Sequence, residues 1–406
     1  MAALGRKFGV LFIGAGNITF GNDNVLWNHS LRIEAYLGAR LDVIGIIDPS
    51  AERVKQVLSQ KSTSAAATCY ANTKHFFTLQ EAQEKLAHMK INPDLILLAT
   101  PPHFRGTMQH GRDLEVQVVS AFGSAPALFV EKPVSTARPL EVWPVAKILQ
   151  QSGNNVAVGY MLRYLKVVQK AMSILHDNNV KVMAVNARYS MAYSRVRKTD
   201  WWNKAKQCGP IVEQATHFCD LCRYLGGEVD LATVRACALE HYEPAGQLSS
   251  MLVDESQIPT EERIPRVTAA FWKYQGGAVG SLMHIVALHG IRYSNEIVVA
   301  GDGFQLRLVD LYSAPTLYVR TPISEQEESF TFINDDPFYS EFAGLLGSLG
   351  AAPCPEAVKN ARSEEQGFVA PSDGILSSYE DACKTYEFTW RIRDESEKSS
   401  QQFREK

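Results

Sequence analysis

The chain has 406 residues, 21% of them charged, and a formal net charge of −3 at pH 7. This length exceeds the roughly 250–300 residues that one hydrophobic core usually serves, so we expect two domains. The nearly balanced charge gives no electrostatic reason to expect nucleic acid or an acidic membrane surface as a partner. A small neutral or weakly charged ligand suits it better.

No apolar run of the sequence reaches the roughly 18–20 residues of a membrane span, and the first residues enter a strand-like run too early for a secretory signal. The seven cysteines are too sparse, and odd in number, for a disulfide framework, so reduced thiols and a cytoplasmic location are expected. The motif "HFCDLC" (217–222) resembles half of a zinc site, but no second pair of ligands accompanies it in the sequence. We therefore predict no metal.

The first part of the chain alternates strand-like and helix-like segments. Apolar, β-branched runs without polar alternation are typical of strands that are buried on both faces of a parallel sheet. Such runs occupy 8–14, 41–48, 94–100, 128–133 and 155–161, with a helix-like segment at 139–151. The fold class is therefore α/β, and residues 1–153 are predicted to form a doubly wound Rossmann domain.

The pattern of strand-like and helix-like segments changes after about residue 180. Longer strand-like runs are joined by "QGG" and "GDG" turns, which favour antiparallel hairpins, and apolar helices interrupt them at 211–227 and 377–393. We expect residues 154–393 to form a second α/β domain with a large open, mostly antiparallel sheet. The polar segments 243–264 and 355–374 are predicted to be surface excursions, and 394–406 a disordered polar tail.

The stretch "GAGNIT" (14–19) follows the first strand. It supplies the first two glycines of a G-x-G-x-x-G pattern, Gly14 and Gly16, and replaces the third by Thr19. The first two permit the tight turn and let backbone N–H groups approach a pyrophosphate, whereas the third only permits close helix packing. We therefore predict a dinucleotide site whose first helix begins late, near Val25. An ordinary glycine turn is the alternative interpretation.

Asp48 ends the second strand, where a carboxylate would accept hydrogen bonds from the adenosine ribose hydroxyls. No arginine follows at once to neutralise a 2′-phosphate, which favours NAD over NADP. Arg53 lies one turn further on and leaves NADP open. Asp48 before Pro49 is also a good helix N-cap, a role that would need no cofactor.

Several further motifs occur in a fixed order: "ATPPHFRG" (99–106), "EKPVS" (131–135), "GYMLRY" (159–164), "EQATH" (213–217) and "SYEDACKTYEFTW" (378–390). With the glycine loop they make the chain resemble the glucose–fructose oxidoreductase, inositol dehydrogenase and rhizopine-catabolism (Gfo/Idh/MocA) family. The sequence of residues 209–227 is most similar to the virulence-factor-like branch of this family. The resemblance implies a Rossmann domain followed by an α/β domain with an open antiparallel sheet.

The resemblance also implies catalytic residues. Lys132, in E-K-P, is expected near the nicotinamide and the substrate hydroxyl, where it would position and polarise the reacting oxygen. The family often carries D-x-G-x-H; here His217 stands at the histidine, and is expected to be the general acid/base, while Glu213 replaces the aspartate. A spacing of four would place both on one helical face. The alternatives are that Lys132 is an ordinary surface lysine, and that His217 is a core histidine whose hydrogen bonds are made within the protein.

Other predicted site residues also follow from the resemblance. The cofactor-binding residues are expected to be Gly14, Gly16, Asn17, Ile18, Asp48, Thr100, Pro101, His103, Glu131 and Lys132. The substrate-binding residues are expected to be Arg163, Tyr164, Trp201 or its neighbour Trp202, and Asp220. Aromatic faces and a fixed guanidinium suit polyhydroxylated rings, but the same residue types also serve ordinary packing.

The resulting hypothesis is an NAD(P)-dependent oxidoreductase that transfers a hydride between the nicotinamide and a secondary alcohol or ketone of a sugar, cyclitol or similar cyclic polyol. One alternative uses tightly held NAD for transient oxidation during an elimination or glycoside cleavage. Another is a non-catalytic regulator that senses a dinucleotide or sugar on the same fold. The open sheet would leave an apolar face, so a homodimer or homotetramer is expected.

Overall fold

The structure, a computed structural model, describes residues 6–22, 27–355 and 374–404. It divides into two compact units, Met1–Met161 with Asp336–Cys383 and Leu162–Asp335 with Lys384–Lys406. This division differs from the predicted domains 1–153 and 154–393, because a late segment returns to the first unit. The expected helix start at Val25 and most of the segment 355–374 lie outside the described residues.

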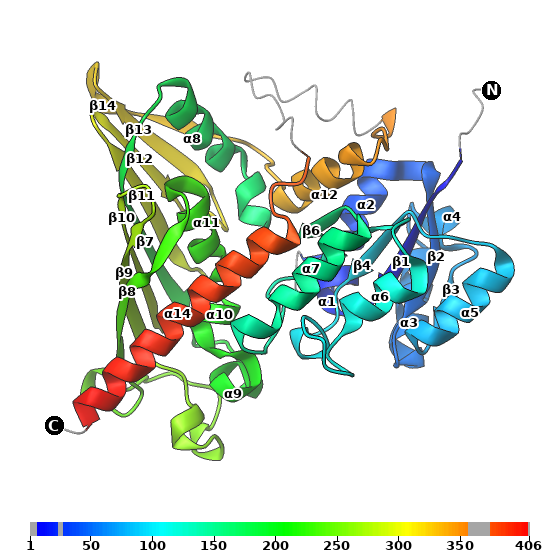
Figure 1. Cartoon of the computed structure of the whole chain (residues 1–406), viewed down its shortest axis with the longest axis horizontal. Helices are drawn as coiled ribbons and strands as arrows, with labels where there is room; N and C mark the ends of the chain where they lie inside the picture. Colours follow the sequence, from blue (N-terminus) through cyan, green and yellow to red (C-terminus); the bar gives the residue numbers. More distant parts are fainter. Residues whose placement is uncertain (1–5, 23–26, 356–373, 405–406) are drawn as a thin grey trace. The chain divides into compact units, whose positions relative to one another are not determined.

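The first unit is built on a parallel sheet in the order β3-β2-β1-β4-β5-β6, seen on the right of Figure 1. Its strands are almost wholly buried, as their non-alternating apolar sequences predict. An order that runs outward from β1 in both directions is that of a doubly wound Rossmann sheet, which confirms the predicted fold. The strands are β1 (Phe8–Ile13), β2 (Leu41–Ile47), β3 (Lys74–Phe76), β4 (Leu95–Leu98), β5 (Ala127–Val130) and β6 (Val156–Val158).

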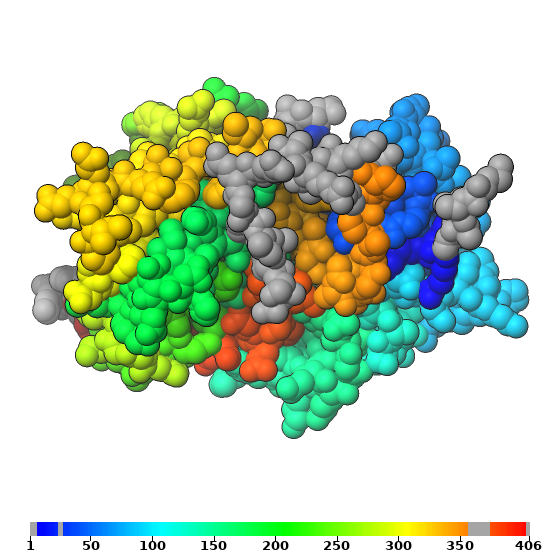
Figure 2. Space-filling view, turned by 90° about the horizontal axis from the view of Figure 1, so that it is seen from above, coloured from blue at the N-terminus to red at the C-terminus, as the bar shows by residue number. Residues whose placement is uncertain are grey.

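One helix of the first unit comes from late in the sequence. In α12 the side chains of Phe342, Leu345 and Leu346 are fully buried and join the core cluster that includes residues of β1, β2 and β4. Figure 2 shows α12 in orange at the surface, so it covers this core with one side only. The helices of the unit are α1 (Asn17–Phe20), α2 (His29–Leu37), α3 (Ala51–Ser62), α4 (Ala67–Tyr70), α5 (Leu79–Met89), α6 (Leu114–Phe122), α7 (Trp143–Ser152) and α12 (Pro337–Ser348).

The second unit is built on an eight-stranded sheet in the order β14-β13-β12-β11-β7-β10-β9-β8. Only β7 and β10 pair in parallel, and the other neighbours are antiparallel, so the predicted mostly antiparallel sheet is confirmed. The strands are β7 (Val182–Ala192), β8 (Val229–Leu239), β9 (Val267–Tyr274), β10 (Val279–Leu288), β11 (Ser294–Gly301), β12 (Phe304–Val309), β13 (Thr316–Thr321) and β14 (Ser324–Thr331).

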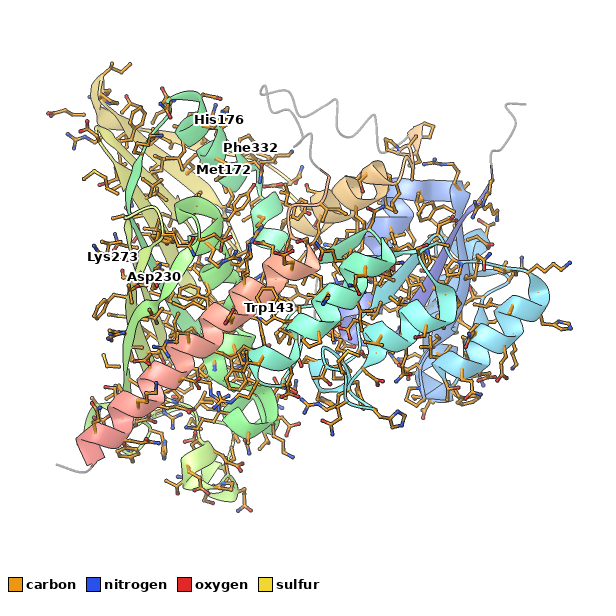
Figure 3. The ribbon with its side chains drawn as sticks, in the orientation of Figure 1. Trp143, Met172, His176, Asp230, Lys273 and Phe332 are labelled. Carbon is orange, nitrogen blue, oxygen red and sulfur yellow. The ribbon has the colours of Figure 1, made fainter. Side chains whose placement is uncertain are left out.

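The helices of this unit lie on one face of the sheet (Figure 1). On that face the ring of Phe388 packs 4.7 Å from the ring of Trp272, measured between centroids. The other face carries exposed side chains; Asp230 and Lys273, which pair across β8 and β9, extend from it in Figure 3. The helices are α8 (Lys166–Asp177), α9 (Lys204–Gln207), α10 (Gly209–Glu213), α11 (Thr216–Gly226) and α14 (Tyr379–Arg404).

Two local predictions are wrong. The polar tail 394–406 is not disordered up to Arg404, because α14 continues to that residue. Charge pairs one turn apart, Arg391 with Glu395 and Arg393 with Glu397, support this part of the helix. The helix expected at 211–227 is two helices, α10 and α11, separated at Gln214 and Ala215.

The excursion 243–264 is anchored by its own apolar residues. Ile258 and Ile264 are buried in a cluster with Trp201 and Trp202 at the end of β7. Arg266, just after the excursion, is also buried and forms an ion pair with Glu255. Across the described ranges, no helix is long and apolar enough to cross a membrane.

Candidate functional site

Three loops of the first unit follow neighbouring strands at the carboxyl edge of the parallel sheet. The glycine loop follows β1, the segment from Ala99 follows β4, and Glu131 and Lys132 follow β5. Since β1, β4 and β5 are adjacent in the sheet, the three loops lie together. Ligands of open parallel sheets bind outside this edge.

Glycine suits the first two glycine positions of the loop for different structural reasons. Gly14 has a φ of +101°, and a Cβ placed there would come within 3.0 Å of the backbone oxygen of Ala99. Gly16 has an ordinary φ of −69°, yet a Cβ there would meet nothing within 4 Å. The space above Gly16 is therefore open, while Gly14 is required by the protein's own backbone.

The third glycine position is occupied by Thr19, whose side chain is fully buried. The predicted late start of the first helix is wrong, because α1 begins directly after Gly16, with Asn17 exposed and Ile18 half-buried. It ends after four residues at Gly21, which has a φ of +71°. Asn28 then caps α2 by accepting from the Leu31 amide. The usual first helix is thus divided into α1 and α2, and the division explains why a third glycine is unnecessary.

Asp48 fastens the glycine loop to the end of β2. Its Oδ2 accepts a hydrogen bond from the Ala15 amide and its Oδ1 accepts one from the Ser50 amide, each at 2.8 Å. Arg53 donates from Nε to the Ala15 carbonyl at 2.8 Å and from Nη2 to the Gly21 carbonyl at 3.2 Å. Arg53 is therefore committed to this loop, which leaves it poorly placed to receive a 2′-phosphate.

The residues at this edge fit a dinucleotide. Asp48 is half-exposed, and each carboxylate oxygen retains a lone pair beyond the amide that it accepts. The Thr100 hydroxyl, after β4, is buried and has no hydrogen-bond partner among the described residues. An orphaned hydroxyl and open space above Gly16 are both consistent with a polar ligand at this edge.

Glu131 lies in a buried hydrogen-bonded pair that the sequence analysis did not foresee. Its Oε1 is 2.5 Å from Nε2 of His29, the first residue of α2, and its Oε2 accepts from the Lys132 amide at 3.2 Å. Burial raises the pKa of Glu131, but the hydrogen bond and charge of His29 outweigh this and lower it from its usual value. The pair holds the backbone of E-K-P, with Lys132 half-buried at its centre.

The segment after β4 is more exposed. Pro101 and His103 are both exposed, and the ring of His103 lies 4.2 Å from that of Phe104. Arg105, which is fully buried, donates to the Thr100 carbonyl at 3.3 Å and so fixes the backbone that carries the orphaned hydroxyl. This segment brings Thr100 to the same sheet edge as the glycine loop.

In the second unit, Glu213 is the last residue of α10 and is half-buried. Its Oε2 accepts a hydrogen bond at 3.1 Å from Nε1 of Trp201, which is itself buried. His217 is buried in the first turn of α11. Because the helix is interrupted at Gln214 and Ala215, the expectation that Glu213 and His217 share one continuous helical face is wrong.

Two residues predicted to bind substrate form a buried ion pair. Arg163 donates from Nε and Nη2 to the two carboxylate oxygens of Asp220, at 2.7 and 2.6 Å. Thr385 of α14 adds a hydrogen bond to the same carboxylate at 3.0 Å. Asp220 thereby ties α11 to α14 and to the segment after β6. Tyr164, next to Arg163, is also buried.

Three tyrosines that the sequence analysis missed gather in this unit. The ring centroids of Tyr189, Tyr293 and Tyr312 lie 5.7 Å (189 to 293), 5.9 Å (189 to 312) and 6.1 Å (293 to 312) apart. They come from β7, from the residue before β11, and from the turn after β12. No local motif marks them, because strand pairing alone brings them together.

The thiols of "HFCDLC" have the character of core residues. Cys219 and Cys222 are fully buried, and burial raises the pKa of both thiols. A thiolate ligand for zinc is therefore disfavoured here. Throughout the described part of the chain, no group of three or more His, Cys, Asp and Glu side chains is arranged to hold a metal ion.

Comparison with known proteins identifies the family. Residues 8–160 match the GFO_IDH_MocA model, described as "Oxidoreductase family, NAD-binding Rossmann fold", and residues 163–304 match an oxidoreductase C-terminal domain model. The chain belongs to the Gfo/Idh/MocA oxidoreductase family. It is accordingly an NAD(P)-dependent oxidoreductase whose first unit is an NAD-binding Rossmann domain.

The relatives cover nearly the whole chain. Two uncharacterized proteins of Schizosaccharomyces pombe are 41% and 40% identical to it; the alignments cover 96% and 95% of this chain and 92% and 96% of theirs. The WlbA dehydrogenase of Bordetella pertussis, solved with NADH and UDP-GlcNAcA, has a similar fold, with a TM-score of 0.61, 16% identity and 97% coverage of each chain. Levoglucosan dehydrogenase, solved with NADH and levoglucosan, has a TM-score of 0.64, 15% identity and coverage of 97% of this chain and 98% of its own.

Proposed function

We propose that this protein transfers a hydride between NAD and a secondary alcohol or ketone on a sugar, cyclitol or similar cyclic polyol. The observation that carries the proposal is the meeting of three loops at one sheet edge: the glycine loop, the segment at Thr100, and E-K-P with Lys132. That arrangement supplies a dinucleotide site and a basic side chain beside it.

Each residue has a role in this proposal. Gly16 leaves room for the pyrophosphate, and Asp48 accepts hydrogen bonds from the adenosine ribose. Lys132 holds and polarises the reacting oxygen, and His217 takes the hydroxyl proton. Bound NAD supplies the hydride acceptor. Because Asp48 keeps lone pairs for the ribose hydroxyls while Arg53 already bonds the loop backbone, NAD is favoured over NADP.

The substrate class rests on the structural neighbours and on the composition of the second unit. The ligands in two of those neighbours, levoglucosan and UDP-GlcNAcA, both contain a sugar ring. In this chain Glu213, which is half-buried beside Trp201, offers a carboxylate, a group that accepts hydrogen bonds from the hydroxyls of a sugar ring. Asp220 and Arg163 support the unit as a pair rather than as separate ligands for substrate.

The test is a fluorescence titration with NADH and NADPH, followed by a screen of polyols and keto-sugars for absorbance change at the nicotinamide band, with Lys132→Ala in parallel. We expect tighter binding of NADH, and turnover that falls about 10²–10⁴-fold in the variant. Lys147→Ala, on α7, is the matched control and should leave turnover unchanged. Binding without turnover would favour the sensing or transient-oxidation alternatives, and absence of binding would overturn the proposal.

We also propose that the helix-free face of the eight-stranded sheet pairs with a second copy of the chain. Phe271, Val279 and Met283 are 58%, 47% and 43% exposed on this face of β9 and β10. Exposed apolar side chains on neighbouring strands favour association. Light scattering after size exclusion should show a dimer or tetramer that Phe271→Glu weakens. A monomer for the wild type would contradict this proposal.

A further inference from the structure

The first turn of α2 contacts two segments of the first unit that lie far apart in sequence. Asn28 caps this helix, and its Nδ2 donates to the carbonyl of Phe20, the last residue of α1, at 2.9 Å. The next residue, His29, lies with Nε2 at 2.5 Å from Oε1 of Glu131. Two successive residues thus hold the segment after β1, which carries the glycine loop, and the E-K-P loop after β5.

The same turn of α2 is anchored to a third segment. The Ser30 hydroxyl donates to Oδ1 of Asn28 at 2.7 Å and accepts from Nζ of Lys61, on α3, at 2.8 Å. Lys61 also forms an ion pair with Glu34, one turn further along α2, and both side chains are 10% exposed or less. A buried polar network whose members all have partners is rigid. The turn therefore provides a fixed base for Asn28 and His29.

The imidazole of His29 is confined by aromatic rings. Its side chain is fully buried, and its ring centroid lies 5.2 Å from that of Phe129, on β5, and 5.1 Å from that of Phe342, on α12. Nδ1 has no hydrogen-bond partner among the described residues. Because an ionised carboxylate can only accept, Nε2 carries the proton of the bond to Glu131. The ring thus has one polar task in the described structure, which is to donate to E-K-P.

The Glu131 carboxylate has little freedom. Its Oε2 accepts from the amide of Lys132 at 3.2 Å, and its own amide donates to the carbonyl of Leu98 at 3.0 Å. Gly159, after β6, lies against it, since a Cβ there would come within 3.2 Å of Oε1 and 3.4 Å of Oε2. A buried carboxylate that loses the His29 donor must move toward another donor or toward water. The Lys132 backbone would then lose its fixed position.

The two segments that α2 holds belong to different halves of the dinucleotide site. In a doubly wound sheet of this strand order, β1 to β3 and β4 to β6 each form one mononucleotide-binding half, and the dinucleotide lies across their boundary. The proposed function places the adenosine ribose at Asp48, in the first half, so the E-K-P loop lies in the nicotinamide half. His29 comes from the first half and bonds the second.

We propose that His29 is a positioning residue for the nicotinamide end of the cofactor site: it joins the two mononucleotide-binding halves and fixes Lys132 through Glu131. This inference rests on the proposed function, since it adds a residue to the same cofactor site. Loss of the bond would loosen E-K-P and leave the glycine loop in place. Binding of the nicotinamide end would weaken, whereas binding of the adenosine and pyrophosphate groups would not.

The experiment compares NADH with ADP-ribose, which keeps the adenosine and pyrophosphate groups and lacks the nicotinamide ring. Dissociation constants of both for the full chain are measured by calorimetry, and the emission spectrum of bound NADH is a second readout. Two amide variants of His29 differ by one methylene group. The amide nitrogen of glutamine can reach the position of Nε2, whereas that of asparagine ends near the position of Nδ1.

We expect His29→Asn to weaken NADH binding about five- to tenfold and ADP-ribose binding less than about twofold, because one hydrogen bond to a charged group is lost at the nicotinamide end only. The emission maximum of bound NADH should shift toward that of free NADH. His29→Gln should restore the NADH affinity to within about twofold of the wild type, together with its spectrum. A merely structural histidine would not distinguish the two ligands.

The controls separate positioning from folding. Leu345→Val, in α12, removes packing from the core that surrounds His29, so it should lower the melting temperature and leave the ratio of NADH to ADP-ribose affinity unchanged. His29→Phe keeps a ring among the aromatic neighbours and removes the donor. It is expected to behave as His29→Asn does and replaces that variant in the comparison if a melting curve shows His29→Asn to be unfolded.

Each outcome decides. Equal weakening of NADH and ADP-ribose, no weakening of either, or failure of His29→Gln to restore NADH binding would overturn the inference. The expected pattern of binding without turnover of any sugar would support the inference and count against the proposed sugar dehydrogenase. A wild type that binds neither ligand would overturn both.

Discussion

The two units build their sites differently. In the first unit, every predicted cofactor residue lies in the loop or short helix that follows a parallel strand, and backbone contacts fix those segments. In the second unit, the important side chains come from strands and helices far apart in sequence. A site made of backbone is therefore visible in local motifs, whereas a cluster of side chains from distant elements depends on strand pairing.

The largest expected effect is a loss of stability when the buried ion pair of the second unit is broken. Arg163→Ala would leave the carboxylate of Asp220, whose side chain is only 1% exposed, buried without its ion-pair partner. We expect a loss of about 3–5 kcal/mol of unfolding free energy, measured by denaturant titration. The double variant Arg163→Met, Asp220→Leu should recover most of this loss. If Arg163→Ala is as stable as the wild type, the pair is not structural.

A second prediction sharpens the distinction between the two glycines of the first unit. Gly14→Ala should cost about 1–3 kcal/mol of stability, because of its positive φ and the close Ala99 oxygen. Gly16→Ala should leave the melting temperature unchanged, since a Cβ there meets no protein atom within 4 Å. It should nevertheless weaken NADH binding about tenfold or more, because the methyl group occupies the space for the pyrophosphate. Unchanged NADH affinity in Gly16→Ala would contradict this placement.

The smallest expected effect concerns pH. Glu131 has a lowered pKa in the folded protein, so its contribution is present above the unfolded value of about 4.3 and is lost as pH falls through the folded pKa. Unfolding free energy should therefore fall more steeply below about pH 5 in the wild type than in Glu131→Gln, by on the order of 1 kcal/mol. Denaturant titrations from pH 7 to pH 4 measure this. Parallel curves would show that the pair with His29 does not stabilise the fold.

Both sheets could be predicted from the sequence because buried strands and hairpin turns leave local signals. The return of Asp336–Cys383 to the first unit could not be predicted. Phe342 and Leu345 would be buried apolar residues in either unit, and only their packing shows that they belong to the core of the first. Neither Gln214 nor Ala215 is a helix breaker, so the interruption before His217 had no local sign. For α14, the spacing of four residues between Arg391 and Glu395 was a local sign of helix. The polar composition of residues 394–406 nevertheless led to the prediction of a disordered tail.

Within the site, the motifs indicated the glycine loop, Asp48 and E-K-P, since these act through backbone geometry at known positions. They did not indicate His29, which reaches Glu131 across 102 positions of sequence. The cluster of Tyr189, Tyr293 and Tyr312 was hidden for the same reason. Its residues become neighbours only through the pairing of β7 with β11 and of β11 with β12.

The most direct test of the central claim is to follow the transfer of a deuterium label from a sugar to the cofactor. The wild-type protein is incubated with NAD and with glucose or levoglucosan deuterated at the ring carbons, and the cofactor is examined by NMR. Direct hydride transfer predicts deuterium at C4 of the nicotinamide in released NADH, and none with Lys132→Ala. A cofactor that stays unlabelled with every deuterated sugar would contradict the assignment of this chain as a sugar-type dehydrogenase.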